Sequence, residues 1–332
     1  MSINVRDWFE QRSFSHEDFA ALGTSGQVSR EVSTTLIFPS RDCAATIGPI
    51  LAEVARLNDR TGLIDQVMVV DADSPDGTAD IAGAWGAEVY SENELLPDYG
   101  PAQGKGDAMW RSLSVARGDI VMFADADTSN FREQFIYGTL GPLLTVPGVQ
   151  FTKAAYRRPY TDSSKSVADG GGRVTELMAK PLFNFFCPEL TGFVQPLAGE
   201  FAGYRDLLCS IPFLTGYGVE LGIMVDVLQE AGLGAMAQID LGARQNRHQS
   251  LWDLSLMSSA VLRAMASRAS LPQRGICAPG TPGVRTLRRP EVYLHAVATD
   301  TGLRLDEHIN ELHERPPLAQ ILLAEQDQDT VA

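Results

Sequence analysis

Two aspartates spaced one residue apart, Asp125 and Asp127, follow the apolar run 120–124. A short apolar run of this kind is typical of a buried strand, and open α/β sheets bind ligands beyond the carboxyl ends of their strands. Carboxylate oxygens at that position can hold a hard divalent cation against a diphosphate. An acidic turn after a strand has the same composition, so the pair alone leaves both interpretations open.

A cationic residue set between glycines lies upstream of this pair. Lys105 is flanked by Gly104 and Gly106, so the backbone can approach a ligand closely while the ammonium group reaches a phosphate. Taken alone, a Gly-Lys-Gly sequence is more often a flexible surface turn. Lys105 is therefore a phosphate-binding candidate only in combination with the other motifs.

A second candidate anion site lies at 170–175, where Gly-Gly-Gly-Arg-Val-Thr precedes a predicted helix. Glycine amides and a helix N-terminus both direct partial positive charge at an anion. Arg173 and Thr175 add side-chain donors suited to phosphate or carboxylate. The other interpretation is a mobile linker, and the helix directly behind it favours the anion site.

The elements that must position these groups alternate between strand and helix along the first half of the chain. The predicted strands are 34–38, which Pro39 should end, 67–70, 88–90 and 120–124, and the predicted helices are 44–57, 79–86 and 107–115. This alternation predicts an α/β fold with a mostly parallel sheet flanked by helices. Further along, the sequence predicts strands at 149–154 and 238–241 and helices at 174–186, 219–230 and 251–271, then a helical tail.

The first thirty residues predict a helical lead-in with a capping box at Ser15 and Asp18. Its aromatic side chains can dock on the core of the sheet. These side chains are Trp8, Phe9, Phe14 and Phe19.

Composition narrows the functional class. The chain of 332 residues carries 27 Lys and Arg against 42 Asp and Glu, a net charge of −15, so binding to nucleic acid or to an anionic membrane is not expected. Its 4 cysteines are scattered with no Cys-x-x-Cys pair, which favours reduced thiols and a cytoplasmic protein. No apolar run is long enough to span a bilayer, and the acidic N-terminus does not resemble a signal peptide.

Two common nucleotide-binding motifs are missing. A dinucleotide-binding domain needs a Gly-rich turn directly after its first strand, whereas here that strand runs into 39–43, Pro-Ser-Arg-Asp-Cys. The segment 104–106 lacks the Gly-Lys-Ser/Thr end of a P-loop. Three features instead resemble the nucleotide-sugar half of a GT-A glycosyltransferase. They are a strand ending at a proline, an Asp-rich turn at 71–76 and the Asp-x-Asp pair.

Five further motifs make the resemblance specific, and they occur in the order 104–113, 156–159, 170–177, 195–200 and 216–220. Together they resemble the mannosyl- and glucosyl-3-phosphoglycerate synthases of glycosyltransferase family eighty-one. The resemblance covers about residues 34–250, and Glu-Arg-Pro-Pro at 314–317 is similar to the family's tail. It implies retaining, metal-dependent transfer of a hexose from a nucleoside diphosphate sugar to the 2-hydroxyl of 3-phospho-D-glycerate, usually by a homodimer.

The resemblance also implies a division of the chain. A helical lead-in (1–30) precedes a GT-A catalytic domain (31–250), which has a nucleotide-sugar half (31–130) and an acceptor half (131–250). A helical, dimer-forming extension (251–332) follows.

Site roles come from the same resemblance. The implied catalytic residues are Asp127, Lys105 and Glu220, and the implied ligands of Mg²⁺ or Mn²⁺ are Asp125, Asp127 and His248. The implied nucleotide-sugar contacts are Pro39, Ser40, Arg41, Cys43, Asp71, Ala72, Lys105, Asp125, Ala126, Leu197 and Glu200. The implied acceptor contacts are Gly171, Gly172, Arg173, Val174, Thr175, Tyr217, Arg244 and Asn246.

One of these motifs departs from its relatives. They read Arg-x-His-Arg-Asn, with His on the metal and Asn on the acceptor, whereas here Asn246 and His248 are exchanged. Strict alignment places Asn246 at the metal. Imidazole is the better transition-metal ligand, which favours His248.

Donor choice departs from the glucosyl pattern as well. Members that use UDP-glucose have Pro-Ala-Leu-Asn-Glu at 39–43, and here Cys43 replaces a Glu near the base and Ala72 replaces a serine. Both changes remove hydrogen-bonding groups suited to uracil, while Arg41 offers paired donors to guanine O6 and N7. The prediction is a GDP-mannose enzyme that can also accept GDP-glucose. The alternatives are a UDP-glucose-dependent glucosyl enzyme and, more remotely, a catalytically silent sugar-nucleotide binding protein.

Overall fold

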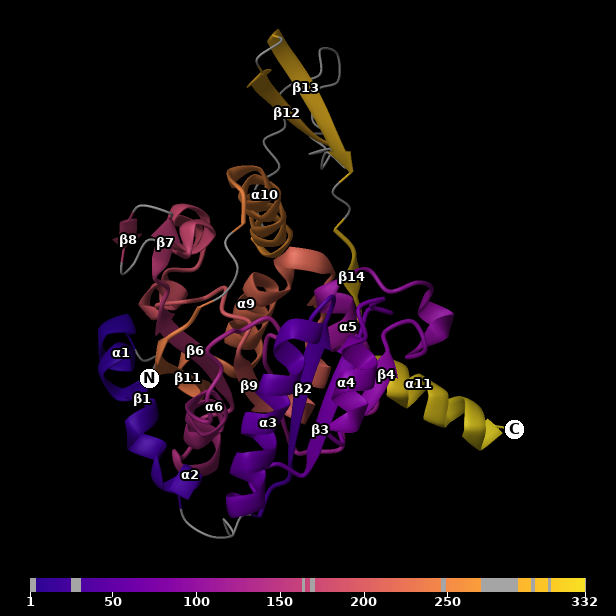
Figure 1. Ribbon diagram of the computed structural model, residues 1–332. Coiled ribbons are helices and arrows are strands. Elements are labelled where there is room, and N and C mark those ends of the chain that lie inside the picture. Colours follow the sequence, from indigo (N-terminus) through magenta and orange to yellow (C-terminus); the bar gives the residue numbers. More distant parts are fainter. Residues whose placement is uncertain are drawn as a thin grey trace.

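The computed structural model describes residues 4–24, 31–162, 165–167, 171–245, 249–269, 292–299, 302–309 and 312–331. Within them, the largest sheet has eight strands in the order β1-β11-β6-β9-β5-β2-β3-β4 (Figure 1). These strands are β1 (Ser13–Ser15), β2 (Thr34–Ser40), β3 (Gln66–Asp71), β4 (Glu88–Ser91), β5 (Ile120–Phe123), β6 (Phe151–Arg157), β9 (Phe201–Tyr204) and β11 (Met236–Ala243). Strand β9 is antiparallel to both of its neighbours, and the other pairings are parallel.

Helices connect and cover these strands. They are α1 (Val5–Arg12), α2 (Ala21–Thr24), α3 (Ala44–Thr61), α4 (Thr78–Ala84), α5 (Lys105–Ser112), α6 (Gln134–Thr145), α7 (Lys180–Phe186), α8 (Arg205–Ser210), α9 (Val219–Ala231), α10 (Leu251–Arg268) and α11 (Leu318–Val331). Every helix and strand predicted before residue 270 is present, with shifted ends. The mostly parallel α/β architecture is therefore confirmed.

Both faces of the sheet are buried, because side chains of a strand alternate between two apolar clusters. In β2, Leu36 and Phe38 join the cluster that contains residues of α3 and α6. Ile37, between them, joins the cluster that contains residues of α5 and α9. Helices on both faces fix the sheet in place, so its carboxyl edge can serve as a rigid support for loops.

Pro39 does not end β2, contrary to the prediction. The strand continues to Ser40, which pairs with Asp71 of β3. The backbone groups of Ile37 face β5, where the Ile37 carbonyl accepts from the amide of Ala124. Pro39 lies two residues after Ile37, so its backbone nitrogen points to the same side of β2. At that level β5 has already ended. The missing N–H of Pro39 therefore removes no bond from the ladder.

Two short strands of the eight-stranded sheet, β1 and β9, were not predicted from the sequence. β1 has three residues, which is too short for a periodic signal, and it pairs in parallel with the edge of β11. β9 contains Gly203, a residue that weakens strand propensity, and it is held between β5 and β6.

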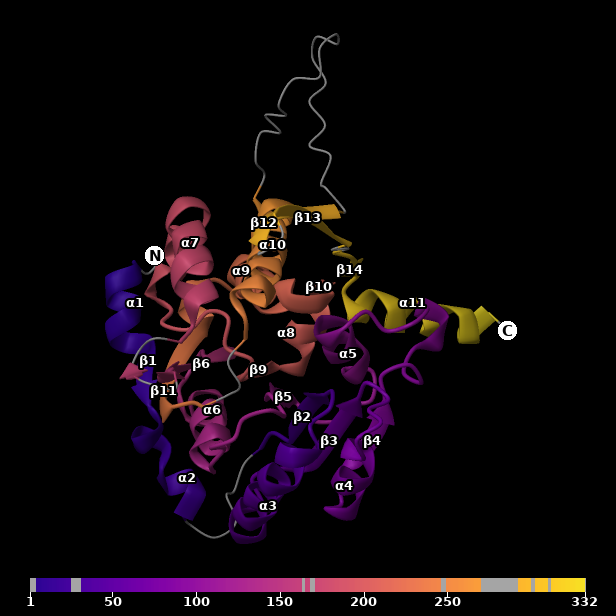
Figure 2. The same cartoon turned by 45° about the horizontal axis from the view of Figure 1, so that its top comes forward.

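The C-terminal part is only partly helical, so the prediction of a helical tail is wrong for its middle. Strands β12 (Val292–Thr299) and β13 (Gly302–Ile309) form an antiparallel hairpin, and β14 (Glu314–Arg315) pairs with β10 (Phe213–Leu214). The β12 sequence is rich in β-branched and aromatic residues, which prefer strands. The hairpin lies against α10, where the rings of Trp252 and His308 have centroids 4.6 Å apart. Figure 2 shows α11 leading from the side of α8 and α5 to the C-terminal end.

Among the described residues, no helix combines the length and the apolar content that crossing a membrane requires.

The N-terminal lead-in is anchored by three of its four predicted aromatic contacts, since Trp8 and Phe19 are buried and Phe14 packs against a core cluster. The capping box at Ser15 is present. Trp8 is fully buried, and its indole Nε1 donates to the carbonyl of Met236 at 2.8 Å. Phe9, also expected to dock, is 45% exposed. The indole of Trp8 therefore ties α1 to the edge of the sheet.

Replacing Trp8 by Ala should lower the free energy of unfolding by about 3–5 kcal/mol, because it leaves a cavity and an unpaired buried carbonyl. Urea unfolding measures this change. The neighbouring change Phe9→Ala is the matched control and should alter the free energy of unfolding by less than about 0.5 kcal/mol. Equal effects of the two changes would contradict the anchoring role.

Candidate active site

A cavity of about 440 Å³ opens beyond the carboxyl ends of β2, β3 and β5. Most of the residues predicted to contact ligands line it together. They are Pro39, Ser40, Arg41, Cys43, Ala72, Lys105, Asp125, Ala126, Asp127, Gly171, Gly172, Arg173, Val174, Thr175, Leu197, Tyr217, Glu220 and Arg244. Residues far apart in the sequence, from Pro39 to Arg244, therefore meet at one edge of the sheet.

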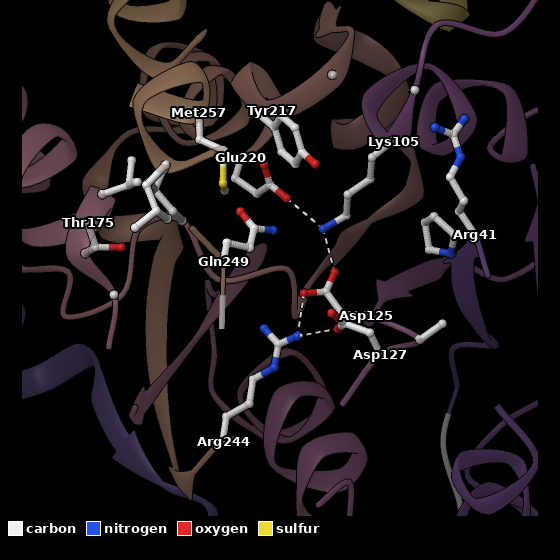
Figure 3. Close-up of a pocket in the computed structure, with 18 of the residues that line it drawn as sticks. Arg41, Lys105, Asp125, Asp127, Thr175, Tyr217, Glu220, Arg244, Gln249 and Met257 are labelled. Carbon is white, nitrogen blue, oxygen red and sulfur yellow. Dashed lines mark hydrogen bonds and ion pairs between the residues drawn. The ribbon is translucent and has the colours of Figure 1, made fainter. Parts of the chain in front are cut away.

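The centre of the cavity is a network of ion pairs around Asp125 (Figure 3). The Lys105 Nζ donates to Asp125 Oδ1 at 2.5 Å and to Glu220 Oε1 at 2.7 Å. Lys105 begins α5, and Glu220 lies in the first turn of α9, so two helix N-termini meet at this amine. Burial alone would lower the pKa of Lys105, but the carboxylates of Asp125 and Glu220 raise it above its usual value. Lys105 is therefore a permanent cation in the cavity.

Arg244 is the second cation of the network. Its Nη2 donates to Asp125 Oδ2 at 2.7 Å and to Asp127 Oδ1 at 3.0 Å. Burial raises the pKa of Asp125, but the opposing charges of Lys105 and Arg244 hold it well below its usual value. The side chain of Asp127 is 55% exposed, so its carboxylate faces the cavity.

The two aspartates fit a divalent cation by the chemistry and the convergence of their oxygens. Both carboxylates reach a single nitrogen atom of Arg244, so one oxygen from each can also reach a single metal ion. Within the described residues, no group of three or more His, Cys, Asp or Glu side chains is close enough to hold a metal. The predicted third ligand, His248, and the predicted acceptor contact Asn246 lie outside the described residues.

Two predicted sugar-nucleotide contacts do not line the cavity. Glu200 is fully buried behind Arg244, where it forms an ion pair at 3.3 Å and accepts from the Tyr156 hydroxyl at 2.9 Å. Burial raises the pKa of Glu200 above its ordinary value, against the effect of Arg244. Asp71 accepts from the amide and hydroxyl of Ser74 and so caps the turn after β3. Both residues support the walls of the site and do not face its interior.

The cavity has two ends on either side of the acidic pair. In Figure 3, Arg41 and Thr175 lie on opposite sides of Asp125. The end near Thr175 contains the glycine segment, where Gly172 has a φ of +70° that favours glycine. There the Gly171 amide donates to a backbone carbonyl at 2.9 Å, so this segment is tied to the strand end rather than being a free linker.

Several lining residues escaped the sequence prediction. Leu254, Met257 and Val261 of α10 supply an apolar wall, and their spacing of three and four residues is a helical face that could have been recognised. Glu92 comes directly after β4, much as Asp125 comes after β5. A carboxylate at the end of a predicted strand could therefore have identified Glu92 as a lining residue. Gln249, in the segment before α10, gave no signal of its own.

Known glycosyltransferases are similar to this chain in sequence and in fold. Residues 35–152 match the family described as glycosyl transferase family 2. The glucosyl-3-phosphoglycerate synthase of Mycolicibacterium paratuberculosis is 41% identical over 273 residues, 81% of this chain and 82% of that protein. The crystal structure of mannosyl-3-phosphoglycerate synthase from Rubrobacter xylanophilus is 55% identical, with a TM-score of 0.82 over 96% of this chain and 99% of that chain. This chain belongs to the family of glucosyl- and mannosyl-3-phosphoglycerate synthases.

A relative with bound ligands has the same fold. The glucosyl-3-phosphoglycerate synthase of Mycobacterium tuberculosis, solved in complex with Mn²⁺, UDP and glucosyl-3-phosphoglycerate, is 34% identical with a TM-score of 0.74. The match covers 93% of this chain and 96% of that chain. The predicted GT-A fold and the predicted class of enzyme, a glycosyltransferase, are thereby confirmed.

An additional cation lies in the core of this glycosyltransferase. Lys153 of β6 is fully buried, and its Nζ has no hydrogen-bond partner within the part of the chain that the structure describes. The amine lies 4.9 Å from the centre of the Phe201 ring. Burial lowers the pKa of Lys153 to about 8, against the opposing effect of Glu220. An amine in this environment is charged at neutral pH at the expense of stability.

Replacing Lys153 by Met should raise the free energy of unfolding at pH 7 by up to about 3 kcal/mol. The folded-state pKa of Lys153 lies below its ordinary value of 10.5, so the protonated amine destabilises the fold below pH 8. This penalty disappears as the pH rises through the folded and then the unfolded pKa, and the advantage of the Met variant should disappear with it. Urea unfolding at several pH values measures the difference. The surface change Lys180→Met is the control and should show no such trend; a pH-independent gain for Lys153→Met would contradict the assignment.

Proposed function

We propose that this glycosyltransferase transfers a hexose, with retention, from a nucleoside diphosphate sugar to the 2-hydroxyl of 3-phosphoglycerate, and that GDP-mannose is its preferred donor. The observation that supports it is the convergence of Asp125 and Asp127 beside Lys105, with a glycine-lined anion site on the other side of the same cavity. The relatives named above carry out this class of transfer according to their names.

The leaving diphosphate would lie at the centre of the cavity. Asp125 and Asp127, with His248 as the proposed third ligand, would hold Mg²⁺ or Mn²⁺. The bound ion would supply Lewis-acid charge to the diphosphate oxygens. Lys105 adds a preorganised positive charge that stabilises the same group as negative charge develops on it. Glu220, at 2.7 Å from the Lys105 amine, holds that amine in the cavity.

The acceptor would occupy the end of the cavity near Thr175. The amide group of Gly172 and the side chains of Arg173 and Thr175 would form a site for the 3-phosphate or the carboxylate of phosphoglycerate, with Gly171 lining it. Tyr217 and Arg244 line the space between this site and the diphosphate, and Val174 and Asn246 complete the proposed set.

The donor base would occupy the end near Arg41. Glu92 lies in the wall there, almost completely buried, with its carboxylate 3.8 Å from the guanidinium of Arg41. Guanine presents N–H donors at N1 and N2 beside the acceptors O6 and N7, so a neighbouring carboxylate and guanidinium match its edge. Uracil places one donor between two acceptors and fits this pair less well. The 55% identity to a mannosyl enzyme also supports GDP-mannose.

The second candidate is transfer of glucose from UDP-glucose. Curated relatives that are 38–43% identical over most of the chain bear the name glucosyl-3-phosphoglycerate synthase. GDP-glucose is a further donor that the same base site would accept. The base site and the hexose site are therefore tested separately.

We also infer a cytoplasmic homodimer. Leu177, Phe185 and Leu251 are each 77–79% exposed on neighbouring parts of the acceptor half and α10. Exposed apolar side chains of this size favour an interface with a second copy.

An activity matrix tests the proposed function. GDP-mannose, GDP-glucose and UDP-glucose are each incubated with Mg²⁺, with and without 3-phosphoglycerate, and the nucleoside diphosphate released is measured. The highest kcat/KM is expected for GDP-mannose with the acceptor present, and chelation of the metal should abolish release. Higher activity with UDP-glucose would establish the second candidate, and release that does not need the acceptor would indicate hydrolysis instead.

Glu92→Gln should shift the donor preference. The amide cannot accept two hydrogen bonds from guanine N1 and N2 as a carboxylate does, so kcat/KM for GDP-mannose should fall by about tenfold or more. The value for UDP-glucose should stay the same or rise. Glu94→Gln, an exposed change two residues away, is the control and should affect neither donor. An equal loss for both donors in Glu92→Gln would contradict a role in base selection.

A further inference from the structure

The tail motif Glu-Arg-Pro-Pro at 314–317 lies outside the cavity, yet it contacts the helices whose N-termini form the cavity. Strand β14 pairs with β10, and the His313 carbonyl accepts from the Thr215 amide at 3.0 Å. Residues 313–316 are called the tail clamp below. Their contacts connect them to α5 directly and to α9 through α10.

The first half of the clamp holds α5. Arg315 donates from Nε and Nη2 to the two carboxylate oxygens of Asp107, at 2.8 and 2.7 Å. Asp107 is fully buried and lies two residues after Lys105, in the first turn of α5. The indole of Trp110 donates to the Pro316 carbonyl at 2.8 Å. Asp107 also accepts from Arg111 of the same helix at 3.2 Å, so Arg315 is the partner that ties this carboxylate to the tail. A bidentate Arg–carboxylate pair fixes both distance and orientation, and it therefore holds the first turn of α5 against the tail.

The second half of the clamp holds α9. Glu314 forms an ion pair with Arg268 of α10. The same guanidinium donates to both oxygens of Asp226 in α9, each at 2.7 Å. Asp226 lies six residues after Glu220, on the same helix. Glu314 and Arg315 are adjacent, so one dipeptide connects the helix of Lys105 with the helix of Glu220.

The space between the two helices permits little movement. A Cβ at Gly106 would lie 2.0 Å from the Leu214 carbonyl oxygen and 2.8 Å from Val219 Cβ. The first turn of α5 is thus in direct contact with β10 and with the start of α9. A shift of α5 along this contact would change the 2.7 Å distance between Lys105 and Glu220.

The geometry points to Glu314 and Arg315 as positioning residues that set the place of the Lys105 amine beside Glu220 and Asp125. Arg315 acts through Asp107, and Glu314 acts through Arg268 and Asp226. Without the clamp, α5 can shift along its contact with β10 and α9, and the amine no longer occupies one position in the cavity. This inference rests on the proposed role of Lys105 in transfer, so its test includes a measurement that does not depend on that role.

The kinetic test uses Arg315→Ala and Arg315→Lys, each in the wild-type and in the Lys105→Ala background. Arg315→Ala should lower kcat by about tenfold and leave the acceptor KM unchanged, because the clamp does not touch the glycine segment. Arg315→Lys should recover only part of the loss, since an ammonium cannot form the bidentate pair. In the Lys105→Ala background, loss of Arg315 should have almost no further effect on kcat. An unchanged kcat in Arg315→Ala, or the same fold loss in both backgrounds, would overturn the proposal.

The structural test measures backbone amide hydrogen exchange over 104–112. Exchange should be faster in both Arg315 variants, while Arg117→Ala, which removes another paired arginine at the exposed edge of the sheet, should leave it unchanged. Leu57→Ala, a core change in α3, serves as the control for a loss of stability and should lower the Tm with little change in kcat. Unchanged exchange in Arg315→Ala would overturn the clamp. A normal kcat in Lys105→Ala with faster exchange in Arg315→Ala would overturn the role of Lys105 and retain the clamp.

Discussion

The site depends on one carboxylate that is shared by two cations. Asp125 accepts from Lys105 on one side and from Arg244 on the other. Removing Lys105 would leave the buried Glu220 without its partner, and removing Arg244 would leave the fully buried Glu200 without one, so either loss is destabilising. The network therefore fixes the relative positions of three parts of the chain that are far apart in sequence: the start of α5, the end of β5 and the end of β11.

Close packing around Asp125 explains a glycine that the motif 195–200 contains. A Cβ at Gly199 would lie 2.1 Å from Asp125 Oδ1, so a side chain at this position would displace the carboxylate. Glu200, the next residue, forms an ion pair with Arg244 from behind. The segment 195–200 thus leaves space for Asp125 at Gly199 and balances the charge of Arg244 with Glu200. Its function is supportive, which differs from the direct sugar contact that was expected of Glu200.

The fold and the site could be predicted best where the signal lies within a short stretch of sequence. Periodic apolar runs predicted the strands and helices of the sheet, and residue type and spacing predicted Lys105 and the aspartate pair. The convergence of Asp125 and Asp127 on Arg244 could not be predicted, because it depends on tertiary contacts across more than a hundred residues. The clamp contact between Arg315 and Asp107 spans 208 positions and has no periodic signal. Short elements such as β1 were missed for the same reason, since their pairing partners, and not their own sequence, make them strands.

Strand β9 explains why the two predicted halves of the catalytic domain form one site. It runs antiparallel between β5, from the nucleotide-sugar half, and β6, from the acceptor half. The sheet is therefore continuous across the division, and both apolar clusters contain residues from each half. Asp125 of the first half is held by Arg244 of the second, so the geometry of the acidic pair requires both. A mostly parallel sheet places ligand-binding loops at one edge, and here a single antiparallel strand brings the second set of loops to that edge.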